Sequence, residues 1–201
     1  MKGVRTGYGL AYRIGFAPWE HYGRVAASTL GALLDREEAD RPYPPGRALD
    51  LGCGRGQKTH ELARRGWDVV GIDTASHAID VARRGPSDAR FVVGDVTVLE
   101  AADLGAFDFF LDVGCFQHLD AEERAAMGRG VSALANPRAT LLMLEFGATR
   151  LRSLTGGVTR AEIQAALPGW DMIAAEPADT TGLGWPLTRT SPHWYRFRLA
   201  A

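Results

Sequence analysis

Residues 47–57, RALDLGCGRGQ, set three glycines at every second position behind a short apolar run. A run of this length favours a buried strand, and glycines directly after it favour a tight turn. The next segment, residues 58–65, has the spacing of a helix that ends at Gly66. This feature predicts a strand, a glycine turn and a helix, with the free N–H groups of the helix start beside the turn.

The rest of the chain continues this alternation of short apolar runs with helical segments. We expect further strands at residues 67–73, 90–95, 107–113, 139–146, 170–176 and 193–199, the last of them edge-like. Helices are expected between them, with N-terminal caps at Thr74, Asp120 and Thr159. Such alternation implies an α/β fold with a mostly parallel sheet and helices on both faces. Ligands of these sheets bind beyond the carboxyl ends of the strands.

Composition and charge argue against several classes of protein. The 201 residues are 46% hydrophobic and carry a net charge of −1, which predicts one globular domain without the basic footprint of a nucleic-acid binder. Cys53 and Cys115 match no disulfide framework and no metal-ligand spacing. No apolar run has the length of a signal peptide or a membrane span. We therefore expect a cytoplasmic monomer or homodimer with no metal, nucleic-acid or membrane partner.

Two classes of cofactor use a glycine turn of this kind: dinucleotides and S-adenosylmethionine. The dinucleotide fingerprint fits poorly, because its third glycine, here Gly56, comes one residue early. Asp73 is placed to accept hydrogen bonds from the ribose hydroxyls of either cofactor. Asp50 would repel a pyrophosphate but attract the ammonium group of a methionine, and Asp95 is placed to accept from an adenine amino group. Three carboxylates favour a cationic cofactor.

The segments LDLGCGRG, VVGID, FVVGDV and FDFFLDVGCFQHL occur in a characteristic order and spacing. Over about residues 47–147 the chain resembles the class I S-adenosylmethionine-dependent methyltransferases. The resemblance implies a Rossmann-like fold with a mostly parallel seven-stranded sheet and an antiparallel last strand. It divides the single domain, 1–201, into an N-terminal helical lid (1–46), a cofactor-binding core (47–147) and a C-terminal part with substrate-side loops (148–201).

The resemblance also implies which residues contact S-adenosylmethionine, or S-adenosylhomocysteine after transfer. The glycine turn would lie against the cofactor, with acidic residues facing its amino-acid end and ribose, and residues after the third and fourth strands facing the adenine and the methionine. Many relatives have two histidines where this chain has a glutamine and a histidine, which leaves His118 as the candidate catalytic base. The implied cofactor-binding residues are Asp50, Gly52, Cys53, Gly54, Gly56, Asp73, Thr74, Gly94, Asp95, Val96, Asp112, Val113 and Gln117.

Family markers narrow the methyl acceptor. Amino-group methyltransferases of nucleic acids resemble one another in a D/N-P-P-aromatic stretch after the fourth strand, whereas residues 112–115 here read DVGC. Residues 12–20, YRIGFAPWE, are similar to the N-terminal segment of small-molecule methyltransferases. We expect methyl transfer to an O, S or N atom of a small, aromatic or heterocyclic acceptor, because flat apolar groups and a sulfonium suit aromatic walls. The expected substrate residues are Tyr12, Phe16, Trp19, Glu145 and Trp185.

Structural roles remain open for several of these residues. The N-terminal aromatic residues are equally suited to helix packing, and His118 to a cap or a core hydrogen bond. Glu145 either faces the substrate or pairs with Arg150 or Arg152. Two other functions also remain open: an NAD(P)-dependent oxidoreductase, and a protein that binds the cofactor without catalysis.

Overall fold

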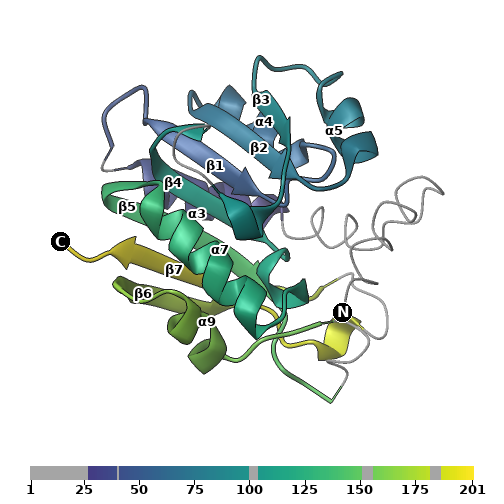
Figure 1. Cartoon of the computed structure of the whole chain (residues 1–201), viewed down its shortest axis with the longest axis vertical. Coiled ribbons are helices and arrows are strands. Elements are labelled where there is room, and N and C mark those ends of the chain that lie inside the picture. The colour runs from purple at the N-terminus through teal and green to yellow at the C-terminus, as the bar shows by residue number, and fades with distance from the viewer. Residues whose placement is uncertain (1–26, 40, 100–103, 151–155, 182–186) are drawn as a thin grey trace.

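Seven strands form one sheet between two layers of helices (Figure 1). The computed structural model describes residues 27–39, 41–99, 104–150, 156–181 and 187–201. The strands are β1 (Arg47–Leu51), β2 (Asp68–Asp73), β3 (Arg90–Val93), β4 (Phe107–Val113), β5 (Ala135–Glu145), β6 (Trp170–Pro177) and β7 (His193–Leu199). The α-helices are α3 (Ala27–Glu38), α4 (Gln57–Arg64), α5 (Ser76–Ala82), α7 (Ala121–Ala133) and α9 (Arg160–Ala166). Single 3-10 turns are Val96–Val98, Phe116–His118 and Leu187–Arg189.

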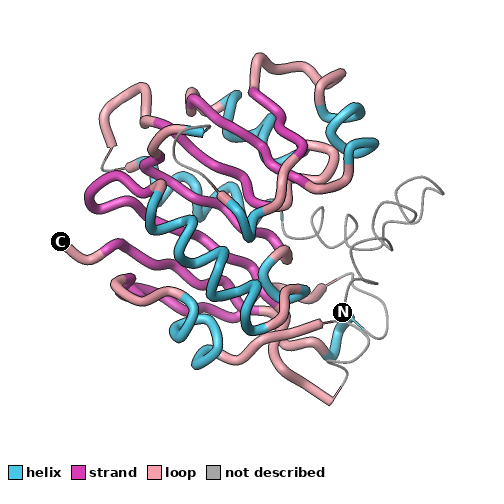
Figure 2. The backbone as a smooth tube through the Cα atoms, in the orientation of Figure 1, coloured by secondary structure: helices cyan, strands magenta, loops and turns pink. Residues whose placement is uncertain are grey.

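The strand order is β3-β2-β1-β4-β5-β7-β6. Strands β1 to β5 pair in parallel, and β7 runs antiparallel to both β5 and β6. This confirms the predicted α/β class and the antiparallel last strand. The backbone tube shows the strands lying together as one sheet with helices beside it (Figure 2). The expectation that residues 193–199 form an edge strand is wrong. Their polar positions include Arg196, which ion-pairs with the buried Glu37 rather than facing solvent, so alternation alone did not reveal an interior strand.

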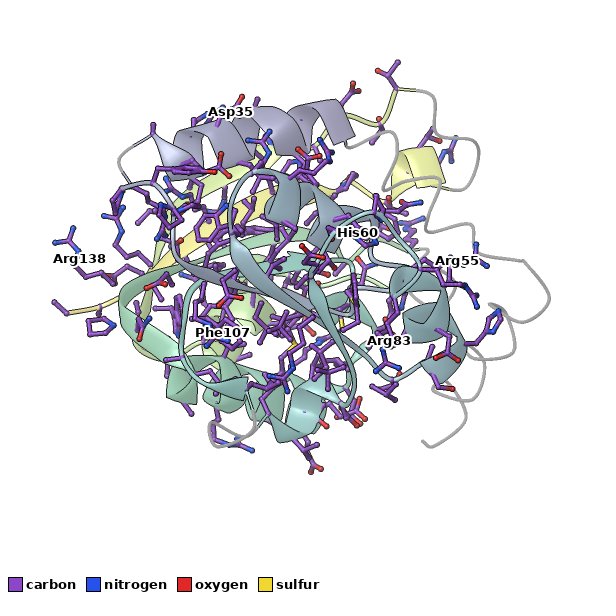
Figure 3. All side chains as sticks on the ribbon, turned by 90° about the horizontal axis from the view of Figure 1, so that it is seen from above. Asp35, Arg55, His60, Arg83, Phe107 and Arg138 are labelled. Carbon is purple, nitrogen blue, oxygen red and sulfur yellow. The ribbon has the colours of Figure 1, made fainter. Side chains whose placement is uncertain are left out.

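Each face of the sheet buries its own apolar cluster. Met127 and Val131 of α7 pack on the face to which Leu49 of β1 and Met143 of β5 contribute. Leu34 of α3 belongs to the cluster on the other face, together with residues of α4. The sheet is thus covered on both sides, and Figure 3 shows Phe107 inside the packed interior while Arg138 points outward.

Helix starts follow the predicted caps at two of three positions. Asp120 with Glu123, and Thr159 with Glu162, form complete capping boxes at α7 and α9. The predicted cap at Thr74 is wrong, because the N-cap of α5 is Ala75 and no side chain caps this helix. The amide of Ala75 instead donates to Asp73 Oδ1 at 2.8 Å. The carboxylate that ends β2 therefore holds the residue before the helix, and it does not cap the amides of the first helical turn.

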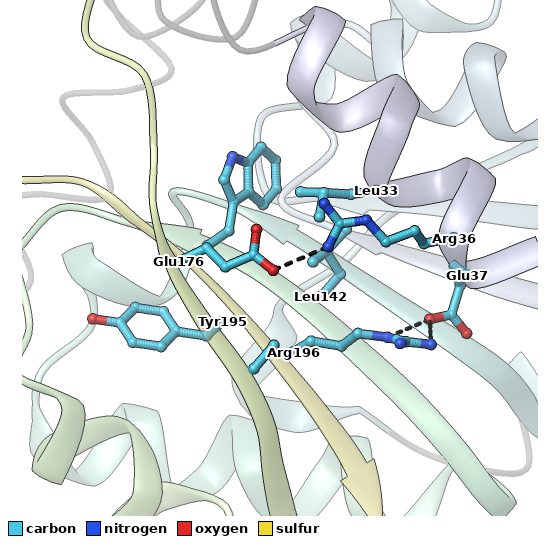
Figure 4. Close-up of a pocket in the computed structure, with 9 residues that line it drawn as sticks. Leu33, Arg36, Glu37, Leu142, Glu176, Tyr195 and Arg196 are labelled. Atoms are coloured by element: carbon cyan, nitrogen blue, oxygen red, sulfur yellow. Dashed lines mark hydrogen bonds and ion pairs between the residues drawn. The ribbon is translucent and has the colours of Figure 1, made fainter.

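Helix α3 is fixed to the sheet by a buried acid, Glu37. Its Oε1 accepts from Arg41 Nη2 at 2.6 Å and from Thr140 Oγ1 at 2.5 Å, and its Oε2 accepts from Arg196 Nε at 2.8 Å. We call these four residues the Glu37 network. A small cavity of about 50 Å³ lies beside it between α3 and strands β5 to β7, and Figure 4 shows Arg196 reaching Glu37 across it.

No helix in the described part of the chain has both the length and the apolar character needed to cross a bilayer.

Candidate functional site

The glycine turn joins β1 to α4 with all three glycines in the left-handed region. Their φ angles are +70° at Gly52, +55° at Gly54 and +79° at Gly56. A Cβ at Gly52 would lie 2.9 Å from Cys115 Sγ, and one at Gly56 would lie 2.7 Å from the ring of Phe91. At these two positions glycine is therefore required by backbone conformation and by packing within the protein.

Two acidic side chains form hydrogen bonds next to the glycine turn. Asp50 is buried and its Oδ2 accepts from Thr59 Oγ1 of α4 at 2.6 Å. Burial raises the pKa of Asp50 to about 6, although the hydrogen bond from Thr59 acts in the opposite direction. Asp73 Oδ2 accepts from the Gly54 amide at 2.9 Å, and burial also raises the pKa of Asp73. Asp73 thereby ties the glycine turn to the end of β2.

The end of β3 carries a third acidic group. Asp95 Oδ1 accepts from the Thr97 amide at 2.9 Å and from Thr97 Oγ1 at 2.8 Å, and so caps the short 3-10 turn that follows. Val96 is buried. The Gly94 amide donates to the Asp73 carbonyl at 3.0 Å, which joins this segment to the end of β2.

Two further carboxyl groups lie under the turn after β4. Asp112 Oδ1 accepts from the Cys115 amide at 2.7 Å, and its Oδ2 accepts from the Phe116 amide at 3.1 Å. Glu145, the last residue of β5, accepts through Oε2 from the Gln117 amide at 3.0 Å. Asp112 and Glu145 are both buried, and we call them the carboxyl pair.

Burial raises the pKa of both members of the carboxyl pair, and the charge of Asp112 adds to this effect at Glu145. Burial raises the pKa of Asp112 to about 7. The pKa of Glu145 is raised further above its usual range, first by burial, then by the charge of Asp112 and by a hydrogen bond to it. Two adjacent buried carboxyl groups resist carrying two negative charges at the same time.

Gln117 and His118 face each other above this pair. Gln117 Oε1 accepts from the Phe146 amide at 2.5 Å, and its Nε2 lies 3.2 Å from His118 Nε2. Because an amide nitrogen only donates, the hydrogen-bond network assigns the acceptor role to His118 Nε2. Burial, followed by the charge of Arg124, lowers the pKa of His118 to about 4. His118 is therefore neutral at pH 7 and only weakly basic, which favours its positioning role over a role as base.

Arg124 of α7 forms hydrogen bonds to backbone carbonyls of the turn that follows β4. Its side chain donates to the Phe116 and Gln117 carbonyls at 3.3 Å each, and its Nη1 lies 3.1 Å from Glu162 Oε1. Sequence reasoning missed Arg124, and it also missed Thr59 under Asp50. The available signal for Arg124 was its place one helical turn after the Asp120 cap.

The structure gathers most of the expected cofactor residues at the carboxyl edge of the sheet. Leu51 pairs with Ile72 on one side and with Asp112 on the other, so the ends of β1, β2 and β4 lie together. Glu145 makes no ion pair with Arg150 within the described residues, and Arg152 lies outside them. No group of three or more metal-ligating side chains occurs in the described part of the chain. The expected substrate residues Tyr12, Phe16, Trp19 and Trp185 also lie outside the described residues.

Comparisons with known proteins find similarity to methyltransferases. A methyltransferase domain family matches residues 48–138. A magnesium-protoporphyrin O-methyltransferase of Rhodobacter capsulatus is 47% identical over 70 residues, which cover 31% of this chain and 29% of that protein. A 23S rRNA uracil-C(5)-methyltransferase of Alkalilimnicola ehrlichii is 37% identical over 119 residues, covering 53% and 26% respectively. The chain spans less than half the length of these curated relatives.

One similar solved structure covers nearly the whole chain. It is a 1,6-didemethyltoxoflavin-N1-methyltransferase of Burkholderia thailandensis with bound 1,6-didemethyltoxoflavin and S-adenosylhomocysteine. The match has a TM-score of 0.72 at 20% sequence identity and covers 98% of this chain and 88% of that one. At this identity the likeness shows a shared fold.

Proposed function

We propose that this chain is a class I S-adenosylmethionine-dependent methyltransferase, in keeping with the methyltransferase domain family that matches residues 48–138. In this proposal it moves a methyl group from the cofactor to an O, S or N atom of a small aromatic or heterocyclic molecule. The observation that carries the proposal is the set of acidic side chains at the carboxyl edge. Asp73 is the last residue of β2, and Asp50 and Asp112 are the last but one of the adjacent strands β1 and β4. Burial raises the pKa of each.

The chemistry of this edge fits a cationic cofactor. The pKa of Asp50 is raised by the charge of Asp73, and that of Asp112 by the charge of Asp50, so negative charge here is incompletely compensated. S-Adenosylmethionine brings a sulfonium and an ammonium group, both attracted to such a field. A dinucleotide would bring two phosphates into it. The acidic edge thus favours methyl transfer over the NAD(P)-dependent alternative.

The predicted contacts remain available to this cofactor. Each oxygen of Asp73 accepts one backbone amide and retains a second lone pair, so the ribose hydroxyls can still donate to it. Asp50 would attract the ammonium group, and Asp95 with Val96 would receive the adenine. The proposed contacts also include Gly94, Val113, Gln117, Cys53, Thr74 and the glycine turn.

The cofactor, when bound, supplies a methyl group that is already activated by the sulfonium charge. The protein has to align the acceptor atom with the methyl carbon and to exclude water. The turn from Cys115 to His118 serves this alignment, because its amides are held by the carboxyl pair and its carbonyls by Arg124. His118, neutral and hydrogen-bonded to Gln117, is proposed to fix the acceptor side of the turn.

Relatives support a small acceptor but include one that acts on RNA. The magnesium-protoporphyrin and didemethyltoxoflavin enzymes are named for small heterocycles, whereas the uracil-C(5) enzyme is named for 23S rRNA. The net charge of −1 favours the small molecule. The proposal includes a cytoplasmic location, suggested by the cysteine pattern, and a monomer or homodimer.

An acceptor screen tests the proposal. The purified chain is incubated with S-adenosylmethionine and panels of hydroxylated aromatics, thiols, heterocyclic amines, RNA, DNA and histones, and S-adenosylhomocysteine is measured. We expect turnover with members of the small-molecule panels and none with the polymers. Turnover on a polymer alone would contradict the proposed acceptor, and cofactor binding without turnover on any panel would favour a binding protein.

A further inference from the structure

The carboxyl pair offers four oxygens to three backbone donors. The amides of Cys115, Phe116 and Gln117 donate to both oxygens of Asp112 and to Oε2 of Glu145. The fourth oxygen, Glu145 Oε1, is buried and accepts from no donor in the described part of the chain. A buried oxygen without a donor is costly, and a proton on it removes the cost by turning it into a donor toward Asp112.

The groups around the pair make its second negative charge unfavourable. The charge of Asp50 on β1 acts on Asp112, while Asp73 of β2, Asp95 after β3 and the pair itself all act on Cys115 in the turn. Tyr195 of β7 also faces Glu145. The cations nearby are Arg124 of α7, which pairs with Glu162 of α9, and Arg160 of α9, which acts on Tyr195.

We infer that the carboxyl pair holds one proton, on Glu145 Oε1, in the free protein and releases that proton to solvent when a cationic ligand binds at the carboxyl edge. Under the proposed function, on which this inference rests, the ligand is S-adenosylmethionine. The O–H bond of Glu145 breaks, its electron pair stays on the carboxylate, and the proton goes to the buffer. The ligand's positive charge then balances the second carboxylate.

The two forms of the cofactor differ in the charge that drives this release. S-Adenosylmethionine carries an ammonium, a carboxylate and a sulfonium, whereas its demethylated product has lost the sulfonium charge. Release of one proton on binding makes affinity rise with pH, by at most about tenfold per pH unit. We therefore expect S-adenosylmethionine to release more protons than S-adenosylhomocysteine, and the pair to take its proton back once the methyl group has left.

Calorimetry in paired buffers measures the proton directly. S-Adenosylmethionine and S-adenosylhomocysteine are titrated at pH 7 into the whole chain, in two buffers with different protonation enthalpies. We expect clear proton release with the first ligand and less with the second. Glu145→Gln, whose amide can still donate to Asp112, should bind with release reduced by at least half. The matched control Glu122→Gln changes an exposed glutamate of α7 and should behave as the wild type.

Infrared spectroscopy of the free protein gives an independent readout. We expect a C=O stretching band of protonated carboxyl groups at pH 7 in the wild type and in Glu122→Gln, and a weaker band in Glu145→Gln, which lacks one of the contributing groups. Absence of the band from the wild type would overturn the inference even if the glutamine variant failed to fold. Cofactor binding without proton release would overturn it while leaving the proposed function intact. No cofactor binding at all would contradict the proposed function itself, and with it the ligand-driven release.

Discussion

Two buried acidic sites lie on opposite faces of the same sheet, and they are satisfied in different ways. In the Glu37 network one carboxylate meets two arginines and a threonine hydroxyl. In the carboxyl pair two acids share three backbone amides, and Arg124 reaches the carbonyls of their turn instead. The first site is complete within the protein, whereas the second retains uncompensated negative charge. A buried acid that lacks a cation is therefore the better guide to a ligand site.

Removing the carboxylate of the Glu37 network should have the largest effect on stability. Glu37→Ala leaves Arg41 and Arg196 facing each other without their partner, and we expect the free energy of unfolding to fall by about 3–5 kcal/mol. Urea unfolding measures the loss. Glu176→Gln, which breaks the more exposed ion pair with Arg36 on the same helix, should change it by roughly 0–1 kcal/mol.

Measuring the affinity of Glu37→Ala for S-adenosylmethionine tests whether the Glu37 network and the carboxyl pair are separate sites. We expect the folded fraction of the variant to bind the cofactor as tightly as the wild type. Loss of affinity in the folded fraction would mean that the two sites are not separate.

Asp73→Ala should have the largest effect on cofactor binding. It removes the proposed acceptor of the ribose hydroxyls and the anchor of Gly54, so we expect a loss of about 2–4 kcal/mol in affinity for S-adenosylmethionine, measured by titration calorimetry. Asp68→Asn, at the exposed start of β2, serves as control. Unchanged affinity in Asp73→Ala would remove Asp73 from the cofactor site.

The buried acidic residues at the carboxyl edge of the sheet should make the free protein less stable at alkaline pH. The pKa values of Asp50 and Asp112 rise to about 6 and 7 in the fold, so the folded state binds more protons than the unfolded chain and stability falls as pH rises through these values. The lowered pKa of His118 acts oppositely, but only between about pH 4 and 6.5.

Between pH 6.5 and 8 we therefore expect the free energy of unfolding to fall, by at most roughly 1.4 kcal/mol per pH unit for each proton lost. Glu145→Gln should flatten this profile, as followed by denaturant titration at several pH values. Identical slopes in the wild type and this variant would show that Glu145 does not titrate in this pH range.

The sequence predicted the strands and the acidic strand ends because both follow from local patterns. RALDL and FDFFLDV read directly as the buried strands β1 and β4, and the boxes at Asp120 and Thr159 are local to one helical turn. The place of β7 inside the sheet was not predictable in this way, because the charge that satisfies Arg196 comes from Glu37, far away along the chain.

The same limit applies to the site. The roles of Asp50, Asp73 and Asp112 as strand-end acids were visible in the sequence. That Glu145 lies against Asp112, and that Arg124 grips the intervening turn, depends on the pairing of β4 with β5 and on the packing of α7. Contacts between residues far apart in the sequence produce no local spacing pattern, so they could not be predicted from the sequence alone.

The smallest expected effect is that of His118→Ala. Since His118 Nε2 already accepts from Gln117 and its pKa is lowered to about 4, we expect kcat to fall less than about tenfold, and equally for acceptors of different acidity. His118→Gln, which keeps an acceptor near Gln117, should restore most of the rate. A loss of about 10²–10⁴-fold that shrinks for more acidic acceptors would instead identify His118 as the base.

The central claim is that the uncompensated carboxyl groups at the carboxyl edge of the sheet select a cationic cofactor. Comparing the affinities of different cofactors tests this claim most directly. S-Adenosylmethionine, S-adenosylhomocysteine and NAD are each titrated into the free protein at pH 7.5 in one calorimetric series. We predict micromolar affinity, which corresponds to a binding free energy of about −8 kcal/mol, for both methionine-derived ligands. We predict far weaker binding of NAD. Binding of NAD as tight as that of S-adenosylmethionine, or no binding of S-adenosylmethionine, would contradict the account.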